Sequence, residues 1–138
     1  MTLTHDACLT RDRRADFPEG TIRQDGRVHR FRRGVGRLVA AVAEPRALLV
    51  VPYYHTGAEQ VQPTSAESTR FFSWPKLGTP IHVIFGPPLD LAPLLALRDR
   101  PPFDRRPELL YEKIAHALEE EVRRLQRELA VRLSGGPS

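Results

Sequence analysis

From residue 107 onward, apolar side chains recur every three or four positions, and this spacing predicts a long amphipathic helix over residues 107–133. Proline is well tolerated in the first turn of a helix, so Pro107 suits its start. The sequence Ser-Gly-Gly-Pro-Ser ends the pattern. Acid–base pairs four positions apart support the helix, namely Glu119–Arg123, Glu120–Arg124 and Glu128–Arg132. The apolar stripe consists of Leu110, Ile114, Leu118, Val122, Leu125, Leu129 and Leu133.

The polar side of this helix indicates what the stripe faces. A helix that lies on a membrane usually carries Lys or Arg on its polar side, with few acids and with bulky aromatics opposite. Here Glu119, Glu120 and Glu121 stand in a row, and Tyr111 is the one aromatic residue. We therefore expect the stripe to face the protein core, at least in its first half, and any membrane contact to lie near residues 30–37.

Two shorter helices are expected earlier in the chain. After Gly34-Val35-Gly36, the side chains of Leu38, Val39 and Val42 share one face at helical spacing, which predicts a helix that ends before Pro45. Residues 89–99 are a candidate second helix, although Pro93 weakens it.

Two apolar runs predict strands. Residues 47–51 form a continuous apolar, partly β-branched run that is typical of a buried strand, and Pro52 stops it. Residues 80–86 form the second, with Ile81, Val83 and Phe85 on one face and His82 and Ile84 on the other. The stretch 53–78 between them has no strong period and indicates a loop.

These elements predict an α/β fold, a small mixed sheet with flanking helices. The strands at 47–51 and 80–86 would be central, and the helix at 107–133 would close the core. We expect a loose N-terminal arm over 1–16, the main domain over 17–104, and the C-terminal helix and tail over 105–138.

The amino-acid composition restricts the number of domains and the classes of partner. The 138 residues suit one domain, and 21 basic against 17 acidic side chains give a net charge of +4, nearly all of it from arginine. This excess favours anionic partners, whether phosphate, lipid headgroups or nucleic acid. Cys8 is the only cysteine, so no internal disulfide can form. No apolar run approaches the roughly 20 residues of a spanning helix, and no signal-peptide core is found near Met1, so we expect membrane contact to be peripheral.

Glu19 is the most conspicuous candidate for a site. It stands between Pro18 and Gly20, which restrict and free the backbone on either side. It is either a solvated turn carboxylate or a positioned acid at the lip of a pocket, facing Thr21 and Arg23.

A basic cluster follows it, formed by Arg30, Arg32, Arg33 and Arg37. Guanidinium groups bind phosphate bidentately, so a phosphate-bearing ligand or lipid surface is one interpretation, and a solvated charged face is the other. The cluster has no recognisable nucleic-acid-recognition motif. His55, beyond the end of a predicted strand, is either a ligand-loop residue or a hydrogen-bonded surface histidine. The five histidines show no metal-ligand spacing, and we expect no metal or other cofactor.

Several segments together resemble the tafazzin family of the glycerolipid acyltransferase superfamily. They are FPEGT (17–21), FRRGVGRLVAA (31–41), VVPYYHTG (50–57), PTSAESTRFFSWPKLGTPIHVIFGPPLDL (63–91) and the long amphipathic helix, in the family's order. The resemblance covers residues 17 to about 133, which correspond to the C-terminal half of a typical member.

The resemblance implies a partial glycerolipid acyltransferase fold and a function in phospholipid–lysophospholipid transacylation, with cardiolipin remodelling at a mitochondrial membrane. It implies that Phe17, Pro18, Glu19, Gly20 and Thr21 bind the phosphate-bearing acyl acceptor. It further implies headgroup or acyl-site contacts by Arg33, Arg37, Val51, Pro52 and His55. Phospholipid, lysophospholipid and the membrane surface are the implied partners, and nucleic acid is not expected.

The family's chemistry rests on His-x-x-x-x-Asp, in which histidine deprotonates the acceptor hydroxyl and aspartate orients it. Here the fifth residue after His5 is Thr10, so the motif is not matched. The family's second block, a glycine-rich segment with arginine, is also not found before Phe17. We therefore expect a truncated and catalytically incomplete form with no catalytic residue of its own. The alternatives are a non-catalytic module that binds anionic lipid surfaces and a basic nucleic-acid-binding protein.

Overall fold

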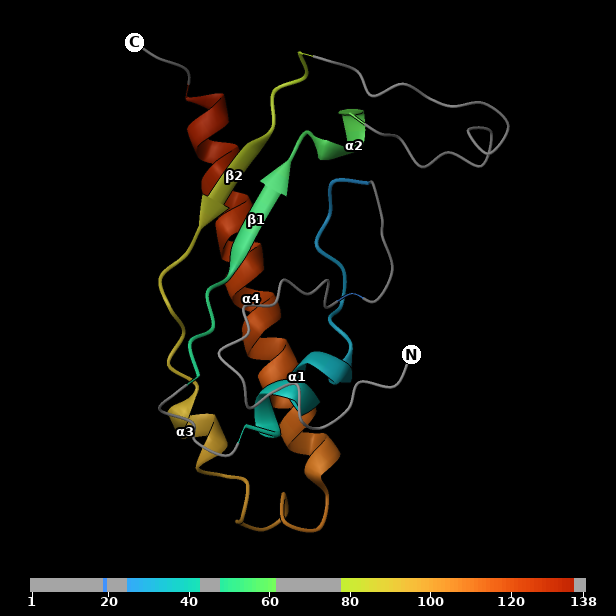
Figure 1. Cartoon of the computed structure of the whole chain (residues 1–138), viewed down its shortest axis with the longest axis vertical. Coiled ribbons are helices and arrows are strands. Elements are labelled where there is room, and N and C mark those ends of the chain that lie inside the picture. The colour runs from blue at the N-terminus through green and yellow to red at the C-terminus, as the bar shows by residue number, and fades with distance from the viewer. Residues whose placement is uncertain (1–18, 20–24, 43–47, 62–77, 136–138) are drawn as a thin grey trace, which may run out of the picture.

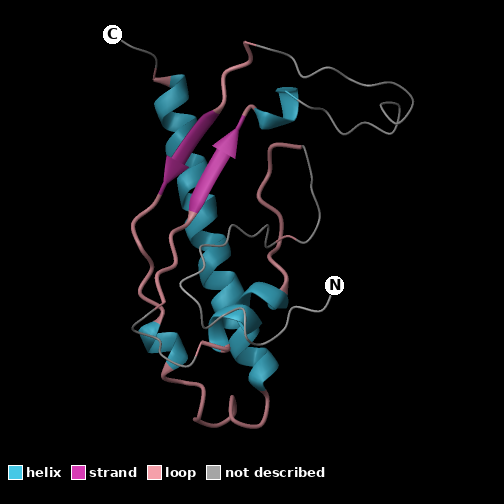
Figure 2. Cartoon of the chain, in the orientation of Figure 1, coloured by secondary structure: helices cyan, strands magenta, loops and turns pink. Residues whose placement is uncertain are grey.

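The computed structural model describes residue 19 and residues 25–42, 48–61 and 78–135. Its elements along the chain are α1 (Arg33–Ala40), β1 (Tyr53–Thr56), α2 (Ala58–Val61), β2 (His82–Phe85), α3 (Ala92–Leu95) and α4 (Pro107–Ser134) (Figure 1). Long connections between these short elements make up much of the rest of the described chain (Figure 2). Within the described residues, no helix combines the length and the apolar character needed to cross a bilayer.

The long helix α4 is the scaffold on which the other elements pack. Helix α1 and helix α3 lie against its first half, and the two strands lie along its second half (Figure 1). The first core cluster contains Leu110, Ile114 and Leu118 of the stripe. Phe31 and the buried side chains of α1 and α3 belong to the same cluster. A second cluster joins Ile84 to Leu125 and Leu129. The prediction that the stripe faces the core is confirmed, and only its last residue, Leu133, is largely exposed.

Helix α1 crosses α4 at close range because Gly36 has no side chain. A Cβ at this position would overlap the backbone carbonyl oxygen of Tyr111. The approach buries Val39 and Ala40, while Leu38 remains exposed. The predicted short helix is therefore confirmed, but its buried side centres on Gly36 and Val39 rather than on Leu38.

The sheet differs from the expected one. Within the described residues it has two strands and is antiparallel, with Tyr53 opposite Phe85 and Thr56 opposite His82, so the expectation of a mixed sheet is wrong for this part of the chain. The second strand was predicted correctly as 80–86, within which β2 lies. The first was misplaced, because β1 begins after Pro52 and not before it.

Proline explains the displacement. Pro52 has no N–H to donate to the ladder, but its carbonyl oxygen accepts a hydrogen bond from the Gly86 N–H at 2.8 Å. Before it, the described part of the apolar run forms only an isolated bridge between Val50 and Leu89. Pairing therefore becomes regular at Tyr53, inside the stretch that was predicted to be a loop, and α2 follows in the same stretch.

Candidate functional site

Glu19 lies in a half-buried turn, where it is bonded to the chain segment that leads into α1. Its Oε1 atom accepts a hydrogen bond from the backbone N–H of His29 at 3.1 Å. Its carbonyl oxygen accepts one from Arg32 Nε, also at 3.1 Å. Glu19 is therefore not a freely solvated carboxylate, since it orients the backbone before α1. The other interpretation, a positioned acid at the lip of a pocket, stays a prediction. Its expected neighbours Phe17, Pro18, Gly20, Thr21 and Arg23 lie outside the described residues.

Glu119, on α4, holds the same segment and was not predicted. The residue is buried, with an exposed fraction of only 7%. Its Oε2 atom accepts a hydrogen bond from the Phe31 N–H at 3.0 Å, and its Oε1 atom accepts one from Arg123 at 2.6 Å. A buried carboxylate is costly unless it is hydrogen-bonded or paired, and both conditions hold here. Two carboxylates far apart in sequence thus bind alternate residues, His29 and Phe31.

The segment held in this way presents an exposed basic surface. We call the side chains of Arg30, Arg32, Arg33 and Arg37 the α1 arginine surface; all four are exposed. Helix α1 has no acidic residue in its first turn and no side-chain cap, so the positive end of its dipole adds to the guanidinium charges.

A shallow hollow of about 280 Å³ lies at this surface, lined by Arg33, Gly34, Arg37, Glu108 and Tyr111. Arg33 Nε lies 3.7 Å from Glu112 Oε1, and this exposed pair contributes little to stability. Two guanidinium groups and an exposed helix start can bind phosphate oxygens.

The structure does not bring the remaining predicted site residues to this surface. His55 belongs to β1, and Val51 and Pro52 directly precede that strand, which lies along the second half of α4 (Figure 1). Val51 is exposed and Pro52 is buried. The His55 ring stacks on Tyr53 with a centroid separation of 6.3 Å, and its Nδ1 atom is buried without a hydrogen-bond partner. Arg33 and Arg37 therefore lie in a different region of the molecule from Val51, Pro52 and His55.

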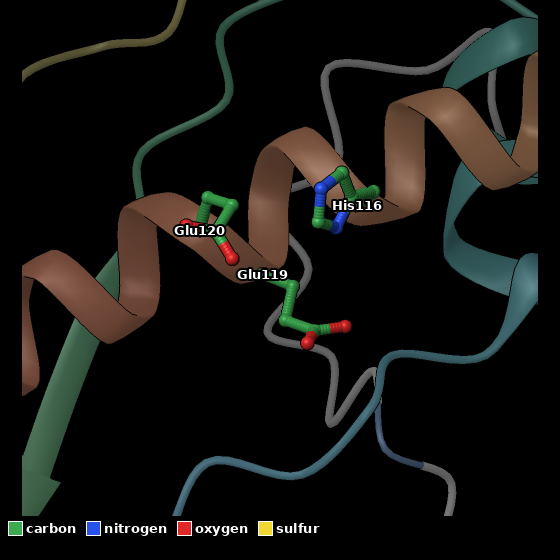
Figure 3. Close-up of side chains that lie close together, drawn as sticks. All are labelled: His116, Glu119 and Glu120. Carbon is green, nitrogen blue, oxygen red and sulfur yellow. The ribbon is translucent and has the colours of Figure 1, made fainter.

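A possible metal-ligand set lies on one turn of α4, where ligand atoms of His116, Glu119 and Glu120 come within 4.8 Å of one another (Figure 3). Both oxygens of Glu119 are already used by Phe31 and Arg123. A divalent cation at this set would also lie beside the Arg123 guanidinium. The set is accounted for by helical spacing, which brings side chains three and four positions apart together.

The chain turns at Asp25-Gly26, where several polar groups are hydrogen-bonded to one another. Gly26 has φ of 69°, a conformation that favours glycine. Hydrogen bonds from the Arg27 N–H and then from His29 Nε2, the latter at 2.6 Å, hold the pKa of the Asp25 carboxyl below its ordinary value. This turn is anchored to α4 because Gln126 donates to the Gly26 carbonyl at 2.7 Å.

The sequence matches no protein-family model, and the fold matches no solved structure. The resemblance to the tafazzin family therefore rests on the quoted segments themselves.

Proposed function

We propose that this chain is the acceptor-binding part of a tafazzin-like phospholipid–lysophospholipid transacylase and is catalytically incomplete. In this proposal it binds the phosphate-bearing lipid peripherally at a mitochondrial membrane, in cardiolipin and phospholipid remodelling. The observation that carries the proposal is the bonding of Glu19, from Phe-Pro-Glu-Gly, to the segment that bears the α1 arginine surface.

The geometry supports phosphate binding because one set of residues positions the backbone and another set offers the guanidinium groups. Glu19 and Glu119 hold the backbone at His29 and Phe31, which fixes the entry into α1. Arg33 and Arg37 then project from the same side of the helix at i and i+4 spacing. A lipid phosphate beside them would receive charge-assisted hydrogen bonds, which are roughly twice as strong as neutral ones.

Acyl transfer needs a base to remove the proton from the acceptor hydroxyl. No histidine in the printed sequence is followed five positions later by aspartate. In the proposal the chain binds and orients phospholipid but does not transfer an acyl chain by itself.

A non-catalytic module that binds anionic lipid surfaces is the second candidate. It is favoured by the exposure of all four arginines and by the absence of acids from the first turn of α1. The α4 stripe cannot serve this function while it is packed in the core. The two candidates differ in lipid specificity. Only the first requires that the chain prefer the phospholipid that serves as acyl acceptor over other anionic lipids.

Co-sedimentation with vesicles tests the binding. Wild-type protein should sediment with phosphatidylcholine vesicles that contain cardiolipin or lysophosphatidylglycerol, and not with phosphatidylcholine alone. The double variant Arg33→Gln/Arg37→Gln should lose this binding. The control variant Arg127→Gln/Arg132→Gln removes the same charge from two exposed positions on α4, away from α1. This control should retain vesicle binding.

Four outcomes would count against the proposal. Equal loss in both double variants would indicate non-specific attraction by net charge. Sedimentation with DNA but not with vesicles would favour the nucleic-acid alternative. Equal binding to cardiolipin, lysophosphatidylglycerol and phosphatidylserine would favour the lipid-surface module. Acyl transfer by the purified wild-type chain, followed with labelled lysophospholipid, would overturn the claim that the chain is catalytically incomplete.

A further inference from the structure

One face of the β1–β2 sheet is largely apolar, and none of the described helices packs on it. Val83 lies opposite His55, and Phe85 lies opposite Tyr53, so these four side chains share a face. Tyr54 and Ile84 alternate with them and pack toward α4. Val83 and Phe85, on the side away from α4, are 48% and 68% exposed. Three residues that flank the two strands, Leu49, Val51 and Ile81, are between 41% and 71% exposed. We call these five residues the outer sheet face.

Exposed large hydrophobic side chains are concentrated on the outer sheet face more than elsewhere in the described part of the chain. The outer sheet face carries five of the eight exposed large hydrophobic side chains found in the described part of the chain. Residues 48–58 and 78–89 contain no Asp, Glu, Lys or Arg, although 28% of the whole chain is charged. Soluble proteins normally protect sheet edges with charged side chains and rarely leave a contiguous apolar patch open. A sheet without such protection is suited to a contact with another apolar surface.

We propose that the outer sheet face is a self-association surface, on which a second copy of this chain packs face to face. A two-fold axis presents the same patch to itself, so the interface is self-complementary without any further surface. The five exposed side chains offer roughly 500 Å² per copy, judged from the sizes of aliphatic and aromatic side chains. Two copies would bury about 1,000 Å², which is at the lower limit of specific interfaces and corresponds to a weak dimer.

A lipid bilayer fits this face less well. Peripheral membrane surfaces combine apolar side chains with Lys or Arg at the same contact. The strands and their flanks have no basic residue, and the α1 arginine surface lies along the other half of α4 (Figure 1). This inference is independent of the proposed phosphate binding, since that binding rests on Arg33 and Arg37, and neither belongs to the outer sheet face.

Sedimentation equilibrium of the purified chain under reducing conditions tests the proposal. Wild-type protein should show a monomer–dimer equilibrium at micromolar concentrations. Val83→Lys should weaken dimerisation at least about 10-fold, because it places a charge at the centre of the contact. The control is Val131→Lys, the same substitution at an α4 position that is 69% exposed and outside the outer sheet face. It should leave the equilibrium unchanged.

Circular dichroism identifies variants that fail to fold. If Val83→Lys does not fold, Phe85→Lys replaces it, because Phe85 is more exposed and its change perturbs the core less. A wild-type chain that stays monomeric at all accessible concentrations would overturn the proposal. Equal weakening by Val83→Lys and Val131→Lys would overturn it too. Binding to pure phosphatidylcholine vesicles that Val83→Lys abolishes would identify lipid as the occupant instead.

Discussion

Glu19 and Glu119 bind the same short backbone segment from two directions, and this arrangement explains how an otherwise irregular stretch is held. Glu19 reaches His29 from a nearby turn, and Glu119 reaches Phe31 from α4, 88 positions away. Each satisfies a backbone N–H that has no ladder partner. Of the two, Glu119 is the more consequential for stability because it is buried.

Replacing Glu119 by alanine should lower the free energy of unfolding by about 2–3 kcal/mol, since it leaves the Phe31 N–H unsatisfied and removes a charge-assisted bond to Arg123. Urea denaturation measures the change. Glu119→Gln keeps an acceptor and should fall between the alanine variant and wild type. The neighbour Glu120 is exposed, so Glu120→Ala serves as the control and should change stability by less than about 0.5 kcal/mol. Equal effects of the two alanine variants would contradict the structural role of Glu119.

Asp25 should contribute a pH-dependent stabilisation. Its pKa in the folded chain lies below the ordinary 3.8, so the charged carboxylate is favoured by folding. The contribution is therefore complete above pH 3.8 and is lost as the pH falls through the lower folded value. Carboxyl carbon chemical shifts should show Asp25 titrating below 3.8, and the stability difference between wild type and Asp25→Asn should shrink in that range. Titration at or above 3.8 would show that the Arg27 and His29 bonds do not form in solution.

At this scale the sequence pointed to Glu19 and to the arginines but not to Glu119. Glu19 is marked by the proline and glycine beside it, which are local signals. Glu119 stands within three consecutive glutamates, and nothing local distinguishes the buried one from Glu120 and Glu121. Its burial follows from where Phe31 packs, which is a tertiary contact that periodicity does not report.

Among the elements, the α1–α4 crossing makes a sharp prediction. Gly36→Ala should destabilise the fold by about 1–3 kcal/mol, because the new methyl group must push α1 away from the Tyr111 carbonyl. Gly34→Ala is the matched control on the same helix, where a Cβ meets no atom within 4 Å. It should be neutral or should stabilise by up to about 1 kcal/mol through helix propensity. Thermal or urea unfolding distinguishes the two, and a stabilising Gly36→Ala would show that the helices are farther apart.

The stripe on α4 gives a second prediction at this scale. Leu118→Asp should cost about 4 kcal/mol or more, because it places a carboxylate without a partner in the first core cluster. We expect loss of the helical circular dichroism signal and of cooperative unfolding. Leu133→Asp makes the same change at the exposed end of the stripe and should leave the fold intact. A folded Leu118→Asp variant that merely fails to bind liposomes would indicate that the stripe faces lipid.

The helices and strands with the strongest hydrophobic periodicity were predicted with the most accurate bounds. Helix α4 was found almost to its last residue because its repeat runs unbroken from Leu110 to Leu133. Strand β1 was misplaced because Pro52 was read as an end. Its carbonyl in fact accepts the Gly86 N–H, so the residue stands at a strand start, where a missing N–H costs nothing. With β1 in this position, the rings of Tyr53 and Phe85, whose centroids are 5.8 Å apart, face away from α4.

For the molecule as a whole, the two proposed surfaces lie along different halves of α4. The α1 arginine surface belongs to the first half, and the outer sheet face belongs to the second (Figure 1). The sequence predicted mixed helices and strands closed by the last helix, which the structure bears out. It did not predict the separation of Arg33 and Arg37 from Val51 and His55, because the spacing of motifs along a chain does not give their distance along a scaffold helix. The proposed lipid and self-association sites can therefore be altered independently.

The position of α4 in the chain also has a consequence for biosynthesis. Both core clusters need side chains from α4, the last of the described elements to be translated. Gln126 illustrates the order, since it donates to the carbonyl of Gly26, 100 positions earlier. While residues 107–134 are still inside the ribosomal exit tunnel, α1 and the two strands lack the α4 side chains that complete both clusters. Neither core cluster can be completed until α4 emerges, so Val39, Ile84 and Leu95 stay accessible to chaperones for longer than they would if the scaffold helix were translated first.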